Sequence, residues 1–265
     1  MSPKSNPIRL IASFFTVSMW TLASRVMGFV REIMFASFFG SSATAEAFQI
    51  AFALPNMFRR FFAEGAFNMA FVPMFAKKLE NGEDAKEFAQ NAMANLATIL
   101  IILTTIALIA MPWFVWATAS GFVGDERFDL ATDFGRIAFP YILFISLAAL
   151  LSGVLNALGR FAAAAAAPVF LNIILVAAMT LAYYQGYDVG RALTWGVPVA
   201  GVVQLGIVWV AAKRAGIRLM PQMPRLTPDI KKLALIPLPA MLAGGVEQLN
   251  LLVGRNGGSD FGGAI

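Results

Sequence analysis

Residues 91–117 read NAMANLATILIILTTIALIAMPWFVWA and carry no charged side chain over their whole length. A transmembrane α-helix needs about 20 consecutive, predominantly apolar residues, so this stretch is long enough to cross a bilayer. Six further stretches of the chain are long and predominantly apolar. A soluble core could bury one or two such stretches but not seven in series, so the sequence predicts an all-α integral membrane protein with about seven transmembrane helices.

The composition is typical of a membrane protein and excludes several kinds of catalytic and metal-binding site. Of the 265 residues, 59% are hydrophobic and only 13% are charged, about half the charged fraction of a typical soluble domain. The chain has no Cys and no His, so thiolate nucleophiles and imidazole bases or ligands are excluded. We therefore expect no enzymatic activity, no metal and no cofactor, and no nucleic-acid partner.

The candidate spans follow one another along the chain at about residues 10–38, 45–75, 91–117, 134–158, 162–184, 192–212 and 230–253. The first two exceed about 20 residues, so they must tilt, bend or protrude, and Pro55 should bend the second. We expect residues 1–215 to form an N-terminal lobe of six helices and residues 216–228 a cytoplasmic linker. Residues 229–265 would then hold the seventh helix, the first of a second lobe, and an atypical Gly-rich end.

Basic residues are distributed unevenly between the loops that these spans create. Twelve fall in one alternating set of loops and only three in the other, and the richer set is expected to face the cytoplasm with the N-terminus. The basic run at 213–232 is interpreted first as an orientation anchor, and binding of anionic lipid headgroups is the alternative. The twelve are Lys4, Arg9, Lys77, Lys78, Lys86, Arg160, Lys213, Arg214, Arg218, Arg225, Lys231 and Lys232, and the three are Arg127, Arg136 and Arg191.

Ionisable residues inside the first two spans are the most informative feature, because each charge near the bilayer centre costs about 2.5–3.5 kcal/mol on insertion scales. Helical spacing places two polar stripes, one on each helix, and Arg31 and Arg59 border them. Facing each other, the two stripes would line a hydrated cavity. The stripes consist of Ser18, Thr21, Arg25, Gly28 and Glu32 in the first span, and of Glu46, Gln49, Asn56, Arg60 and Glu64 in the second.

The four arginines have two interpretations. Guanidinium groups bind phosphate oxygens bidentately and stay charged, so Arg25, Arg31, Arg59 and Arg60 are candidate ligands for a phosphate-bearing substrate. Alternatively, Arg60 pairs with Glu64 at i, i+4 and Arg31 pairs with an acidic neighbour, and the stripes only hold helices together. We favour the ligand cavity for Arg25 and Arg31, and leave both interpretations open for Arg59 and Arg60.

Three stretches of sequence resemble signatures of the MurJ/MviN family. The resemblance covers nearly the whole chain, and the second stretch is the longest and most specific. The stretches are residues 24–32 (SRVMGFVRE), residues 54–67 (LPNMFRRFFAEGAF) with residues 70–73 (AFVP), and residues 155–161 (LNALGRF) with Pro168 and Asn172.

The resemblance implies a flippase that moves lipid II, the undecaprenyl-diphosphate-linked peptidoglycan precursor, across the bacterial inner membrane. It also implies two lobes, alternating access about a cationic cavity, and Arg25, Arg31 and Arg59 as cavity arginines. Gly28, Glu32, Asn56, Glu64 and Gly65 would have gating or structural roles. Family members are roughly twice as long, so we expect a second lobe to be missing. A fragment, a frameshifted product and a split protein whose partner chain supplies the missing lobe are the open explanations. The alternatives are another lipid-linked oligosaccharide or drug exporter of the same superfamily, and a half-protein that does not transport by itself.

Overall fold

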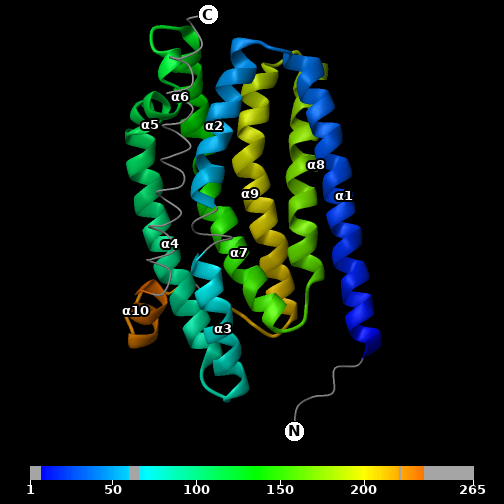
Figure 1. Ribbon diagram of the computed structural model, residues 1–265, viewed down its shortest axis with the longest axis vertical. Coiled ribbons are helices and arrows are strands. Elements are labelled where there is room, and N and C mark those ends of the chain that lie inside the picture. The colour runs from blue at the N-terminus through cyan, green and yellow to red at the C-terminus, as the bar shows by residue number, and fades with distance from the viewer. Residues whose placement is uncertain (1–6, 60–65, 221, 236–265) are drawn as a thin grey trace, which may run out of the picture.

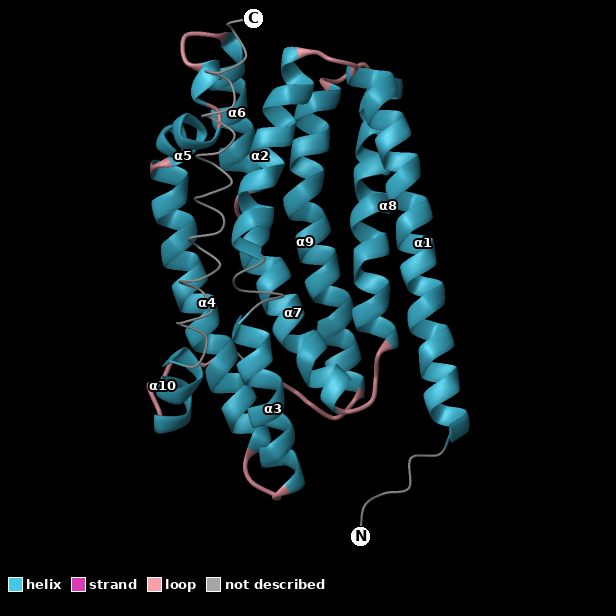
Figure 2. Ribbon diagram, in the orientation of Figure 1, coloured by secondary structure: helices cyan, strands magenta, loops and turns pink. Residues whose placement is uncertain are grey.

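The computed structural model describes residues 7–59, 66–220 and 222–235, and all regular structure within these ranges is helical (Figure 2). The all-α prediction is therefore confirmed. The helices are α1 (Pro7–Phe39), α2 (Ala43–Arg59), α3 (Ala66–Glu80), α4 (Ala85–Ile109), α5 (Met111–Thr118), the short 3-10 helix η2 (Ser120–Phe122), α6 (Glu126–Ala138), α7 (Tyr141–Ala157), α8 (Ala162–Gln185), α9 (Val189–Arg214) and α10 (Pro228–Leu235).

Four helical segments of the described chain are long and apolar enough to cross a membrane: Ala85–Ile109, Glu126–Ala157, Ala162–Gln185 and Val189–Arg214. They correspond to the third to sixth spans expected from the sequence. The first expected span is α1, and the second is divided between α2 and α3. The seventh expected span falls mostly on residues beyond Leu235, outside the described residues.

Two expected spans are each interrupted near a proline residue. The uncharged stretch 91–117 is divided at Ala110 between α4 and α5, and Pro112 lies in the first turn of α5. Pro140 separates α6 from α7 in the same way. Proline has no backbone N–H, so it fits the first turn of a helix, where that N–H would have no partner. Apolar periodicity alone did not reveal these breaks.

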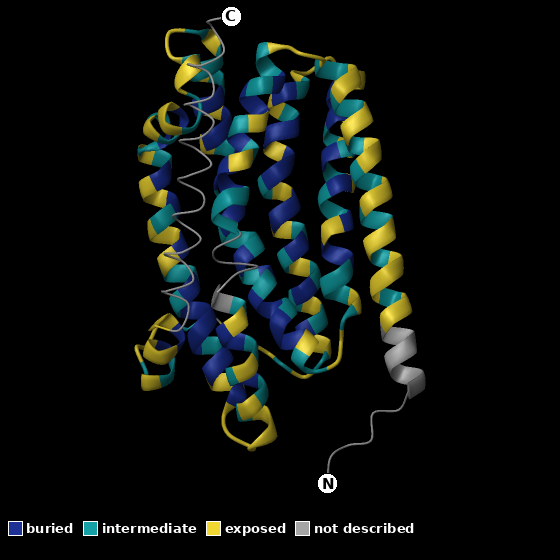
Figure 3. Cartoon of the chain, in the orientation of Figure 1, coloured by how far each residue is buried: buried dark blue, intermediate teal, exposed yellow. Residues whose placement is uncertain are grey.

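The helices pack into an elongated bundle in which α7 is largely buried, α9 packs against α7 and α8, and α1 lies at one edge (Figures 1 and 3). Contact between α7 and α9 is close at Gly201, where a Cβ atom would come within 2.8 Å of the buried Tyr141 ring. The Tyr141 hydroxyl also hydrogen-bonds Oε1 of Gln204 at 3.2 Å, and Nε2 of Gln204 donates to the Ala167 carbonyl at 2.9 Å. This buried polar group ties α7, α9 and α8 together.

The helix α1 contacts the rest of the bundle chiefly through α8. Its opposite face exposes large apolar side chains, including Phe14, Met19 and Phe29. Apolar side chains on an unpacked helix face suit lipid or another apolar protein surface. The edge helix that carries Arg25 and Arg31 is therefore open on one side to whatever surrounds the lobe.

The two sets of loops defined by charge lie at opposite ends of the bundle. The α3–α4 and α7–α8 turns and α10 lie at one end, and the α1–α2, η2–α6 and α8–α9 connections lie at the other (Figure 1). At the second end, Asp125 and Asp188 cap α6 and α9 by accepting backbone N–H bonds. At the first end, α10 begins at Pro228, and the Ile230 N–H donates to Thr227 Oγ1, which agrees with a capping hydroxyl followed by proline at the first helical position.

Candidate functional site

Arg25 and Arg31 both lie deep within α1. At a rise of 1.5 Å per residue, Arg25 is about 27 Å from the start of the helix at Pro7 and about 21 Å from its end at Phe39. The hydrocarbon core of a bilayer is about 30 Å thick, so any membrane position that covers most of α1 places Arg25 inside it. Arg31 lies about 9 Å further along the same helix.

Arg31 borders a cavity of about 220 Å³ between α1 and α2, with α8 and α9 behind it. Its walls are mostly apolar, and Glu32, Gln49 and Arg31 itself supply the charged and polar groups. At about 30 Å³ per water molecule, the cavity has room for about seven waters. One residue of each stripe, Glu32 and Gln49, lines this cavity, although α1 packs mainly on α8 rather than on α2.

The Arg31 guanidinium is held by two neighbours. Nη1 donates to Asn172 Oδ1 on α8 at 3.1 Å, and Nη2 forms an ion pair with Glu32. The Arg31 side chain remains 23% exposed, and that of Glu32 is 62% exposed. The ion pair agrees with the structural interpretation of Arg31, but the adjoining cavity leaves one side of the guanidinium accessible.

Asn172 is the member of the site that sequence reasoning missed. It is a buried amide in an otherwise apolar helix, and its Nδ2 also donates to the Ser24 carbonyl of α1 at 3.1 Å. Gly28 packs beside it, since a Cβ atom at Gly28 would lie 3.6 Å from Asn172 Nδ2. The signal was present, because Asn172 belongs to the quoted third motif, but nothing in the sequence indicated which helix it would contact.

Arg25 differs from Arg31 in its surroundings. Its side chain is exposed, and it has no hydrogen bond or ion pair to any described residue. Among the described residues, Glu32 pairs with Arg31, and no carboxylate pairs with Arg25. The α1 stripe keeps a net positive charge there.

On α2, Asn56 and Arg59 follow the same side of the helix as the cavity residue Phe52. Asn56 Nδ2 donates to the Phe52 carbonyl at 2.8 Å, and Arg59 Nε donates to Asn56 Oδ1 at 3.2 Å. The Asn56 side chain therefore orients Arg59. Arg60, Glu64 and Gly65 lie outside the described residues, and so does the expected Arg60–Glu64 pair.

The arrangement suits binding of an anion rather than bond-breaking chemistry. A fixed guanidinium group, such as that of Arg31 beside this cavity, can hold phosphate oxygens without proton transfer. Among the described residues, no group of three or more acidic side chains is placed to hold a metal ion.

Comparisons with known proteins identify the family of the chain. Residues 35–260 match the family model described as "Lipid II flippase MurJ". The probable lipid II flippase MurJ of Rhizobium meliloti is 48% identical over 97% of this chain and 49% of its own length. The lipid II flippase MurJ of Burkholderia cenocepacia is 40% identical over 96% of this chain and 51% of its own length.

Among solved structures, a lipid II flippase MurJ in an inward closed conformation superposes with a TM-score of 0.71. It is 25% identical and covers 89% of this chain and 49% of that one. A transporter of the MOP superfamily from Pyrococcus furiosus, 16% identical with a TM-score of 0.64 over 90% of this chain and 54% of that one, shares the fold. The chain spans about half the length of the curated relatives it matches. With the family model matched over most of its residues, the chain belongs to the MurJ family of lipid II flippases, which are transporters rather than enzymes.

Proposed function

We propose that this chain forms the N-terminal lobe of a flippase that moves lipid II across the bacterial inner membrane. Residues 1–215 form the lobe, residues 216–228 form a cytoplasmic linker, and residues 229–265 open a second lobe. The N-terminus faces the cytoplasm, because the loops at that end of the bundle are the basic ones.

In this proposal the arginines of α1 and α2 capture the diphosphate of the lipid. Arg31 and Arg25 contact the phosphate oxygens, and Arg59 and Arg60 extend the cationic surface along α2. The polyprenyl tail stays in the lipid outside α1, whose apolar face is exposed. Rocking of this lobe against a second lobe then exposes the headgroup on the opposite side of the membrane.

The single observation that supports this role best is the position of Arg25 and Arg31. Arg25 and Arg31 both lie at bilayer depth, and of the two only Arg31 pairs with a carboxylate among the described residues. Arg31 also borders a cavity with room for water. Charged residues inside a membrane protein are costly and are kept where they face a cavity, a partner or a ligand. An anionic lipid headgroup provides the missing counter-charge.

Since the chain corresponds to half of its relatives, its activity should be tested together with a second lobe. The chain would be joined to the C-terminal half of the Rhizobium meliloti relative, or expressed beside it as a separate chain. Both forms would be introduced into a bacterium depleted of its own lipid II flippase. Growth with either form, but not with residues 1–265 alone, is the expected result.

Arginine variants of the chimera make the test specific. Arg25→Ala and Arg31→Ala should abolish growth, and Arg31→Lys should restore little, because a lysine cannot form the bidentate contact. Lys86→Gln, which removes an exposed basic residue of α4, is the matched control and should grow normally. Full growth of both alanine variants, with normal protein levels, would refute the assigned role of these arginines.

A further inference from the structure

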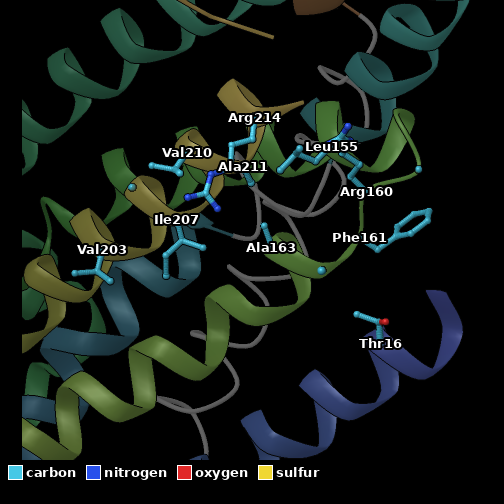
Figure 4. A pocket seen from close by; sticks show the side chains of 13 residues that line it. Thr16, Leu155, Arg160, Phe161, Ala163, Val203, Ile207, Val210, Ala211 and Arg214 are labelled. Atoms are coloured by element: carbon cyan, nitrogen blue, oxygen red, sulfur yellow. The ribbon is translucent and has the colours of Figure 1, made fainter. Parts of the chain in front are cut away.

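A second and larger cavity, of about 980 Å³, lies away from the Arg31 site. It is bounded by Thr16 of α1, the loop between α7 and α8, and one face of α9 (Figure 4). This is the end of the bundle where the basic loops gather. The proposed transport mechanism makes no use of it.

The α9 wall of this cavity is an apolar track that ends in a cation. Its lining residues recur at i, i+3, i+4, i+7, i+8 and i+11, which places them on one helix face. From Val203 to Arg214 the track is about 16 Å long. The residues are Val203, Gly206, Ile207, Val210, Ala211 and Arg214.

A second cation, Arg160, comes from the loop that precedes α8. Gly159 adopts a positive φ of 71° after α7, and the Arg160 N–H donates to the Leu155 carbonyl at 2.8 Å, so the backbone at Arg160 is fixed. Figure 4 shows Arg160 and Arg214 toward one end of the cavity, with Val203 further along. The first turn of α8 also lines the cavity without a side-chain cap, and it adds positive potential.

Neither guanidinium has a counter-charge among the described residues. Arg160 and Arg214 form no ion pair or side-chain hydrogen bond with another described residue, and no acidic side chain lines the cavity. The cavity therefore combines two uncompensated cations with an apolar track about 16 Å long. This combination complements a molecule with an anionic head and a hydrocarbon chain.

We propose that this cavity is a binding site for an anionic glycerophospholipid of the cytoplasmic leaflet. The phosphate is held between Arg160 and Arg214, and one acyl chain lies along the α9 track past Gly206. Gly206 has no atom within 4 Å of the position its Cβ would take, so the groove is open there. This proposal requires that the lobe lie in a membrane, but it does not require that the chain transport lipid II.

Native mass spectrometry of the purified 265-residue chain tests the site directly. The chain would be titrated with phosphatidylglycerol and with phosphatidylcholine carrying the same acyl chains. Both lipids carry the phosphate, but the quaternary ammonium of phosphatidylcholine neutralises its headgroup and is repelled by the two guanidinium groups. Phosphatidylglycerol should therefore bind about tenfold more tightly, and Arg160→Gln with Arg214→Gln should remove that preference. Lys86→Gln, a basic residue at the same end that does not line the cavity, should keep it.

A variant that fills the groove distinguishes the contribution of the apolar track from that of the two arginines. Gly206→Leu should weaken both phospholipids, whereas Gly206→Ala, which adds one methyl group in open space, should change little. Equal binding of the two phospholipids, or an unchanged preference in the double arginine variant, would overturn the proposal. So would displacement of phosphatidylglycerol by millimolar inorganic phosphate, or by undecaprenyl diphosphate at equimolar amounts, because the site would then belong to a free anion or to the carrier lipid.

Discussion

Asn172 connects α8 to the arginine stripe of α1, and its replacement by leucine is the most informative single substitution. Leucine has nearly the same size, so the packing volume is kept while the amide is removed. The change deletes the 3.1 Å bond from Arg31 Nη1 and the 3.1 Å bond to the Ser24 carbonyl. Both bonds cross between α8 and α1, and Asn172 is buried.

The expected loss of unfolding free energy lies between the values measured for hydrogen bonds in soluble proteins and in membrane proteins. Hydrogen bonds to charged groups contribute about 1.5–3 kcal/mol in soluble proteins. Interhelical hydrogen bonds in membrane proteins average about 0.6 kcal/mol and reach about 1.7 kcal/mol. For one charged and one neutral bond we expect Asn172→Leu to lower the unfolding free energy by about 1–2 kcal/mol.

A double-mutant cycle isolates the part that comes from Arg31. Arg31→Gln, Asn172→Leu and the double variant would be unfolded reversibly in mixed detergent micelles. The coupling energy should be about 1 kcal/mol, because each single change already removes the shared bond. Thr180→Val on the same helix is the control, since Thr180 bonds only the Val176 carbonyl within α8 and should show no coupling to Arg31. Strictly additive effects of Arg31→Gln and Asn172→Leu would refute the inferred contact.

Two further predictions concern packing and pH. On α9, Gly201→Ala should destabilise the chain by about 1–3 kcal/mol, because the new Cβ would lie 2.8 Å from the buried Tyr141 ring. Gly206→Ala, which places a methyl group in open space, should instead stabilise the chain by about 0.4–1 kcal/mol. Melting-temperature shifts of similar size and the same sign in the two variants would contradict the packing of α7 on α9. The pKa of Lys78 is raised above 10.5 by hydrogen bonds to Asp229 of α10 and to Glu83. Its contribution to holding α10 against α3 is therefore complete below pH 10.5 and is lost as the pH rises through the raised pKa. Spin labels on α3 and α10, placed by cysteine substitution in this cysteine-free chain, should keep one distance from pH 6 to pH 10 and separate above that range; separation already at pH 8 would contradict the contact.

The helical architecture could be predicted because its signals are local. Uncharged runs such as residues 91–117 exceed the length of a bilayer span, and Thr227-Pro228 marks a helix start by capping chemistry alone. The breaks at Ala110 and Pro140 were not anticipated. Hydropathy continues across both positions, and the proline beside each break could equally have lain inside an unbroken helix, as Pro168 and Pro198 do in α8 and α9.

The site could be predicted only in part, because the contacts that join α1 to α8 are tertiary. Helical spacing put Arg25, Gly28 and Glu32 on one face of α1 and identified Arg31 at its border. Which helix α1 would meet depends on packing, and the partner proved to be α8 rather than α2. The Asn172 contact follows from that choice of neighbour.

The central claim is that the cavity beside Arg31 is wet and receives an anionic lipid head. The direct measurement is modification of Gln49→Cys, a cavity-lining position, by a charged thiol reagent soluble only in water. Joined to a C-terminal lobe, the protein should be labelled, undecaprenyl diphosphate but not undecaprenol should protect it, and Arg31→Gln should remove the protection. A cysteine that is never labelled, or protection that is equal for the neutral alcohol, would contradict the account.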